Sequence, residues 1–280
     1  MTMKMHYLSL CFVPLFFLST IASAGLVLNP QRIVVLDRER TASLELLNTS
    51  DEAARFQIYF EHKKMREDGS IVDLDDNEIN DGRQLAGDMI RYSPRRVNIE
   101  SQGSQTIRLA VRRPKDLADG EYISHLALKQ IPNKVEPVTN KTGEASAEEK
   151  ALSFKVQPIL KIAIPVIVRK GMLQASATIS DISLVQEDER QPFVQLKLHR
   201  SGNRSLYGDV EIFRLEGNST GTRVGFAKGI ALYEPTLSRV VNVQVDKEVA
   251  DPGTKLLVRF DEKGKYGGDN SVEQIITVQP

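Results

Sequence analysis

The residue types that most often perform catalysis are sparse in this chain and show no catalytic spacing. Its four histidines are isolated from one another, and its single cysteine stands alone near the N-terminus. The chain contains no H-E-x-x-H, G-x-S-x-G or C-x-x-C motif and no glycine-rich phosphate loop, so the familiar sets of nucleophile, base and metal ligand are missing. The sequence therefore predicts a protein that is not an enzyme and that needs no cofactor.

One acidic segment, residues 66–87, carries oxygen-bearing side chains at alternate positions, as calcium loops do. Counted from Asp73, an EF-hand loop would need glycine at its sixth position and glutamate at its twelfth. This chain has Glu78 and Gln84 there. We therefore predict a loop without a metal.

Recognition by strand pairing is a further chemistry to consider, and residues 152–168 are the candidate for it. Leu152, Phe154 and Val156 alternate with polar residues after a long charged segment, 133–150, that we predict to be mobile. A sheet edge has free N–H and C=O groups and can pair with another chain. An ordinary core strand would show the same alternation, and spacing alone does not separate the two interpretations.

The elements around this segment are predicted to be β-strands, because short β-branched and aliphatic runs are broken by Gly, Pro, Asn and Asp. Residues 41–46 and 107–111 have an apolar side chain at every second position, as strands with one wet face require. The predicted strands are 31–36, 41–47, 55–62, 96–99, 106–112, 121–131, 152–168, 177–184, 193–199, 208–215, 224–230, 239–245, 255–260 and 272–278.

Two sets of about seven strands predict an all-β protein of two immunoglobulin-like β-sandwich domains joined by a short linker. The first set ends in charge and a glycine at residues 169–171. We therefore divide the chain into an N-terminal domain, residues 25–169, and a C-terminal domain, residues 170–280.

The first 24 residues have the pattern of a cleavable signal peptide. Lys4 precedes an apolar run, residues 8–21, and small residues end at Ala24. The run contains Pro14 and is shorter than the roughly 20 residues of a membrane span. Cleavage would remove Cys11, and an exported chain without disulfides points to a bacterial periplasm.

The charges of the chain balance, with 37 basic and 37 acidic residues. This balance argues against a nucleic-acid partner. Arginine clusters such as residues 91–96 and 112–113 are read as solvated strand faces. No later segment is apolar enough for stable membrane insertion.

In the order of its motifs, the chain resembles the periplasmic chaperones of the chaperone-usher pathway, which assemble pili. The matching segments are Asn29-Pro-Gln-Arg-Ile-Val-Val-Leu36, Tyr92-Ser-Pro94, Gln105-Thr-Ile-Arg108, Glu121-Tyr-Ile-Ser-His-Leu-Ala-Leu-Lys-Gln-Ile-Pro132 and Leu160-Lys-Ile-Ala-Ile-Pro-Val166. The resemblance extends over most of residues 25–280, and it points to a divergent or archaic-type branch.

The resemblance implies a function and partners. Family members lend a strand to a pilus subunit that lacks one, a form of β-strand addition, and deliver the subunit to an outer-membrane usher. Leu152, Phe154 and Val156 match the inserted row. Pro158, which has no N–H to donate, interrupts the matching strand.

The resemblance also implies two charged sites. Arg32 and Lys161 match the cations that grip the C-terminal carboxylate of the subunit. Arg108 and Glu121 match members of an ion-pair network between the domains, and Asp269 is the candidate for its third member.

A structural fibre subunit or surface adhesin of immunoglobulin-like domains is the alternative function. Such a subunit should have one incomplete sandwich behind an N-terminal extension. Here two strand sets follow a short N-terminus, which favours the chaperone.

Overall fold

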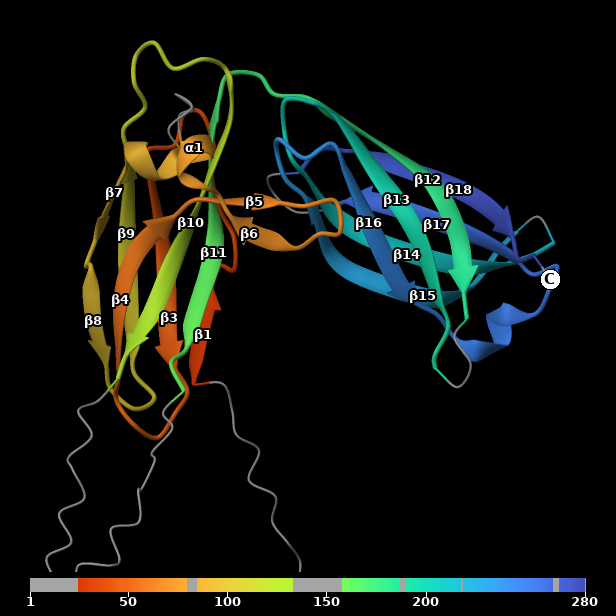
Figure 1. Ribbon diagram of the computed structural model, residues 1–280, viewed down its shortest axis with the longest axis horizontal. Helices are drawn as coiled ribbons and strands as arrows, with labels where there is room; N and C mark the ends of the chain where they lie inside the picture. The colour runs from red at the N-terminus through yellow and green to blue at the C-terminus, as the bar shows by residue number, and fades with distance from the viewer. Residues whose placement is uncertain are drawn as a thin grey trace, which may run out of the picture.

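Two β-sandwiches make up the computed structural model, which describes residues 25–79, 85–132, 158–186, 190–217, 219–263 and 267–279. The sandwiches lie at an angle to each other, and the chain passes once between them (Figure 1). This arrangement confirms the predicted fold class. The predicted signal peptide and the predicted inserted residues Leu152, Phe154 and Val156 lie outside the described residues.

The N-terminal sandwich packs a four-stranded sheet on a five-stranded sheet. In order across the first sheet, the strands are β1 (Leu26–Asn29), β3 (Thr41–Asn48), β9 (Ser104–Val111) and β7 (Ile90–Ser93). In order across the second, they are β2 (Ile33–Val35), β11 (Lys161–Lys170), β10 (Gly120–Ile131), β4 (Ala54–Glu61) and β8 (Arg96–Ile99).

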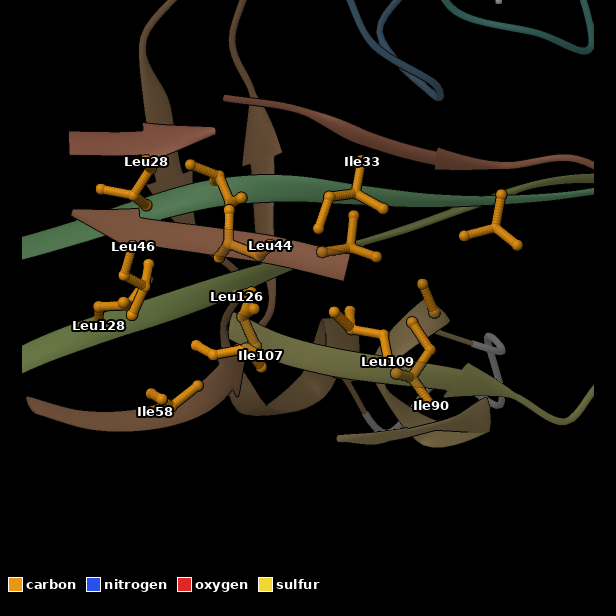
Figure 2. Close-up of a cluster of buried hydrophobic side chains, with 14 of the residues drawn as sticks. Leu28, Ile33, Leu44, Leu46, Ile58, Ile90, Ile107, Leu109, Leu126 and Leu128 are labelled. Atoms are coloured by element: carbon orange, nitrogen blue, oxygen red, sulfur yellow. The ribbon is translucent and has the colours of Figure 1, made fainter. Parts of the chain in front are cut away.

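The alternation of apolar residues along these strands builds the core of the N-terminal sandwich. Leu44 and Leu46 of one sheet and Leu126 and Leu128 of the other are fully buried (Figure 2). Since successive side chains of a strand point to opposite faces, the residues between them face away from the core. We call this opposite side of the five-stranded sheet the outer face.

The chain changes sheets near its start. Strand β1 pairs antiparallel with β3 in one sheet, whereas β2 pairs parallel with β11 in the other. The predicted strand 31–36 therefore corresponds to the shorter β2, and β1 was not predicted.

The C-terminal sandwich packs a three-stranded sheet on a four-stranded sheet. Its core is built by alternate residues such as Val194, Leu196, Val258 and Phe260, all fully buried. The first sheet has the order β12 (Ala175–Val185), β13 (Phe193–Gly202) and β16 (Ser238–Gln244), and the second has β15 (Ser219–Leu232), β14 (Leu206–Glu216), β17 (Lys255–Glu262) and β18 (Ser271–Thr277). A short 3-10 helix, η2 (Lys247–Ala250), follows β16.

The prediction of an irregular loop over residues 66–87 is wrong. A hairpin of β5 (Lys63–Met65) and β6 (Ile71–Asp73) begins just before this segment and places its turn and second strand within it, followed by the helix α1 (Asp76–Ile79). The 3-10 helix η1 (Ala86–Met89) begins at its end. Three-residue strands are too short to show a period, which is why the pattern did not reveal them.

The long predicted strand 152–168 also needs correction. In its described part, residues 158–160 are not in a strand, and β11 begins at Lys161. Pro158 explains part of this, because it cannot donate a hydrogen bond to a ladder. No helix of the described residues is long and apolar enough to cross a membrane.

Candidate functional site

The outer face of the five-stranded sheet meets the C-terminal sandwich at a buried ion pair. Glu121 and Arg169 lie opposite each other on β10 and β11. Arg169 Nε donates to Glu121 Oε2 over 2.9 Å. The other carboxylate oxygen, Oε1, accepts hydrogen bonds from the backbone N–H of Ser205, at 3.1 Å, and from the Ser205 hydroxyl. One carboxylate therefore connects two domains.

Arg32 lies at the same junction. Its guanidinium carbon is 3.5 Å from the centre of the Tyr207 ring of β14, a cation-π contact across the domains. Burial lowers the pKa of Arg32, although Tyr233 and Tyr207 act in the opposite direction. An arginine keeps its charge despite such a shift. The junction thus holds a buried cation whose flat face is covered by an aromatic ring.

Further along the outer face, charged side chains form a chain of ion pairs. Lys161 of β11 reaches across β10 to Glu61 of β4. Glu61 also pairs with Lys63 at 3.1 Å, and Lys63 pairs with Asp73 of the hairpin. Because Ala127 lies between Tyr59 and Ala163 in the ladders, a small side chain leaves room for Lys161 to cross.

These contacts shift the pKa values of their members. Burial alone would raise the pKa of the Glu61 carboxyl, but hydrogen bonds from Lys161 and Lys63 outweigh it and hold the pKa below its usual value. The hydrogen bond to Glu61 raises the pKa of Lys161 in turn. Both groups are therefore charged at neutral pH. Lys161, which the family resemblance matches to a cation that binds a partner's carboxylate, is thus already paired with Glu61.

The structure does not bring Arg32 and Lys161 together. The parallel register pairs Ile33 with Val166, so Arg32 aligns with Pro165. Lys161 is four residues further along β11, which at about 3.3 Å per residue is roughly 13 Å away. Both cations belong to one sheet; here Lys161 pairs with Glu61, and Arg32 lies against the ring of Tyr207.

His125 is a buried titratable group on this face. It lies between Glu61 and Pro165 in the ladders, and its side chain is 4% exposed. Its Nδ1 atom has no hydrogen-bond partner among the described residues. Burial, assisted by the charge of Lys63, lowers the pKa of His125 to about 4. The imidazole is therefore neutral at physiological pH.

Strand β11 has an open edge beside these residues. It pairs with β10 over its whole length, whereas β2 covers only Val166 to Val168 on the other side. Along residues 161–165 no other described strand pairs with that second edge. A strand with one free edge can accept hydrogen bonds from, and donate them to, an added strand.

The remaining predicted site residues are apart from the junction. Arg108 lies on β9 of the other sheet, exposed between Ser43 and Ser93. Asp269 is exposed in the segment before β18. Glu121 instead contacts Arg169 and Ser205. Among the described residues, no group of three or more His, Cys, Asp or Glu side chains could hold a metal ion.

Sequence reasoning missed Arg169, Ser205, Tyr207 and Glu61. A signal for Arg169 was available. When β10 and β11 pair antiparallel, the start of β10 lies beside the end of β11, which places Arg169 opposite Glu121. The three others depend on contacts between domains or across a middle strand. Local sequence has no signal for these.

Comparisons with known proteins give structural likenesses only. No family model matches the chain, and no curated protein matches it in sequence. The chain is similar to the CupB2 chaperone of Pseudomonas aeruginosa at 13% identity, with 89% of this chain and 100% of that chain covered and a TM-score of 0.45.

Two further solved structures are similar over much of the chain. For the E. coli chaperone DraB the identity is 15%, the coverage 89% of this chain and 95% of that one, and the TM-score 0.44. The third is a complex of the chaperone CsuC with the tip subunit CsuE, from archaic chaperone-usher Csu pili of Acinetobacter baumannii. Its identity is 14%, the coverage 91% of this chain and 99% of that one, and the TM-score 0.43.

Proposed function

We propose that this protein is a periplasmic chaperone that binds unfinished pilus or surface-fibre subunits by lending them a β-strand and delivers them to an outer-membrane usher. The observation that carries the proposal is the open edge of β11 along residues 161–165. A second chain can add there through main-chain hydrogen bonds, with alternate side chains giving specificity. The predicted signal peptide supports the periplasmic location.

In this proposal, Leu152, Phe154 and Val156 enter the groove of the subunit. Burial of three such side chains would contribute about 5–9 kcal/mol before the cost of ordering the segment. The sequence predicts that the segment before β11 is mobile, and the cost of ordering it on binding would offset part of the gain. The affinity should therefore depend strongly on each inserted side chain.

Two cations are available for the C-terminal carboxylate of the subunit, and the geometry separates their roles. Arg32 is covered by Tyr207, whereas the Lys161 side chain is 42% exposed. We assign the carboxylate to Lys161, because a partner can reach it along the open edge. The carboxylate would then compete with Glu61, the present partner of Lys161.

The proposal is tested by co-expression with secreted immunoglobulin-like subunits and isolation of a one-to-one complex by size exclusion. Phe154→Asp should abolish the complex, since a charge cannot enter an apolar groove without a large desolvation cost. The matched control is Phe226→Asp, at an exposed phenylalanine of β15 in the C-terminal sandwich. Binding that survives Phe154→Asp would refute strand lending.

A further inference from the structure

The hairpin β5–β6 extends from the N-terminal sandwich toward the C-terminal one (Figure 1). Its residue Met65 is 7% exposed and belongs to the hydrophobic core of the C-terminal sandwich, with residues such as Leu198 and Val241. One domain therefore supplies a core side chain to the other. Burying a methionine removes a large apolar surface from water, so this contact favours the docked hairpin.

Polar contacts hold the hairpin on the C-terminal sandwich next to Met65. The Thr236 hydroxyl donates to the Met65 carbonyl oxygen over 2.6 Å. The Val240 N–H donates to the Glu67 carbonyl oxygen over 2.7 Å. The Glu67 carboxylate accepts a hydrogen bond from the Ser238 hydroxyl at 2.8 Å. Backbone and side-chain bonds thus fix the hairpin turn against β16 and the loop before it.

The turn itself is shaped to fit this surface. Gly69 has a φ of +82°, which favours glycine, and a Cβ atom there would lie 2.4 Å from the Arg239 guanidinium. The Arg239 side chain is anchored by a hydrogen bond to the Ala231 carbonyl oxygen at 2.6 Å. A larger residue at position 69 would be strained by the positive φ and would require the Arg239 side chain to move.

The base of the hairpin is fixed to the N-terminal sandwich. Leu74 N–H donates to the His62 carbonyl oxygen over 2.9 Å and closes the base of the hairpin. His62 Nδ1 lies 3.2 Å from the Ser124 hydroxyl oxygen of β10, and Lys63 pairs with Glu61 of β4. The hairpin is therefore tied at both ends, one end to each domain. Its position in space is determined by two sandwiches at once.

The two domains have a second attachment at the polar junction of Glu121 with Ser205 and of Arg32 with Tyr207, near the covalent linker. Between that junction and the hairpin lies a cavity of about 340 Å³, lined by both domains. Domains joined at one place move as the default, whereas two separated attachments oppose rotation about either. We infer that the hairpin β5–β6 is a clamp that locks the angle between the sandwiches.

The test measures the angle and the clamp separately in the full protein. Spin labels are placed at two exposed positions, by Glu52→Cys and Lys255→Cys, in a mature chain that otherwise has no cysteine. Met65→Ala should broaden the distribution of distances between the labels. It should also make the Val240 amide exchange at least about tenfold faster, because large-to-small core changes cost more than the 1.4 kcal/mol of a tenfold change.

The matched control is Met172→Ala, at a methionine in the linker that is 88% exposed. It should change neither quantity. Thr236→Val, which removes only the hydroxyl that binds the Met65 carbonyl, should show the same two effects more weakly and guards against simple unfolding of the Met65 variant. An unchanged distance distribution in both the Met65 and Thr236 variants would overturn the clamp.

Discussion

Two buried glutamate-arginine pairs, one in each sandwich, use their carboxylates differently. Both oxygens of Glu262 bind Arg204, at 2.7 and 3.0 Å, and Oε2 also accepts hydrogen bonds from Asn270 and from the Gly268 N–H. All of these partners belong to the C-terminal sandwich. Burial alone would raise the pKa of the Glu262 carboxyl, but the bonds from Arg204 and Asn270 outweigh it and lower the pKa.

The carboxylate of Glu121 is divided between domains instead. One oxygen binds Arg169 of its own sandwich at 2.9 Å, and the other binds Ser205 of the second sandwich. A bidentate pair of hydrogen bonds from arginine to a carboxylate within one domain contributes to the stability of that domain. A carboxylate shared between domains contributes mainly to their relative position. The difference shows that equal burial and equal residue types do not imply an equal role.

The largest effect on the free energy of unfolding should come from breaking the pair of Glu262 with Arg204, which lies within one domain. Glu262→Ala leaves Arg204 buried without its counter-charge, which should lower the free energy of unfolding of the C-terminal sandwich by about 3–5 kcal/mol. Denaturant titration measures this loss. The control is Glu273→Ala, whose pair with Arg259 at the surface should be worth less than about 1 kcal/mol. Equal losses in the two variants would contradict the comparison.

The next largest effect should be a difference in acid sensitivity. The stability of the N-terminal sandwich should fall in acid, because this sandwich contains the buried His125. Its pKa is about 4 in the folded protein against 6.5 in the unfolded chain, so the unfolded state binds the proton first as the pH falls. The stability that depends on neutral His125 is complete above pH 6.5 and is lost progressively from 6.5 to about 4, by about 3 kcal/mol in all. The groups that face this imidazole are Lys63, Glu61, Asp73 and His62.

Calorimetry from pH 7.5 to 4 checks this prediction. His125→Gln should flatten the acid dependence of the N-terminal transition. His199→Gln in the C-terminal sandwich serves as the control, since His199 is only partly buried and its Nε2 is 2.7 Å from the Ser180 hydroxyl oxygen. An acid slope that His125→Gln leaves unchanged would exclude this histidine as its cause.

The sandwiches could be predicted from sequence because their strands are long enough to show a period of two. Strand β8 was predicted with its observed bounds, and β3, β10 and β13 within a few residues. The three-residue strands β5 and β6 were not. Asp68-Gly69 is a turn signal, but the charged residues before it hide the hairpin, and nothing local indicates that Met65 fills the core of another domain.

Site contacts could be predicted only where they follow from the pairing of neighbouring antiparallel strands. Residues on neighbouring antiparallel strands meet by register, so the pair of Glu121 with Arg169 was within reach of sequence reasoning. The spacing between Arg32 and Lys161 along the sheet depends on where β2 joins β11, a long-range register that local sequence does not determine. Ser205 is placed by the angle between the sandwiches, which is a property of the whole molecule.

A smaller effect is expected from the shared carboxylate. Ser205→Ala removes one donor to Glu121 but leaves Arg169 in place, so the free energy of unfolding should fall by only about 1–2 kcal/mol. The main effect should be a change in the angle between the domains, which small-angle X-ray scattering measures. Ser180→Ala, within the C-terminal sandwich, is the control. A changed stability with an unchanged scattering profile would mean that Glu121 acts like Glu262.

The smallest effect on stability should come from Glu61, because the side chain of its partner Lys161 is 42% exposed and its other partner, Lys63, keeps Asp73 as a counter-charge. Glu61→Gln should change the free energy of unfolding by no more than about 1 kcal/mol. If Lys161 receives a partner's carboxylate as proposed, the same variant removes the internal competitor. Its affinity for a peptide that ends in a free carboxylate should then rise about three- to tenfold, since ~0.7–1.4 kcal/mol is released. Calorimetric titration with the free and the C-terminally amidated peptide makes the distinction, because only the free form should gain affinity. An equal gain for both forms would show that Glu61 shapes the open edge without competing for Lys161.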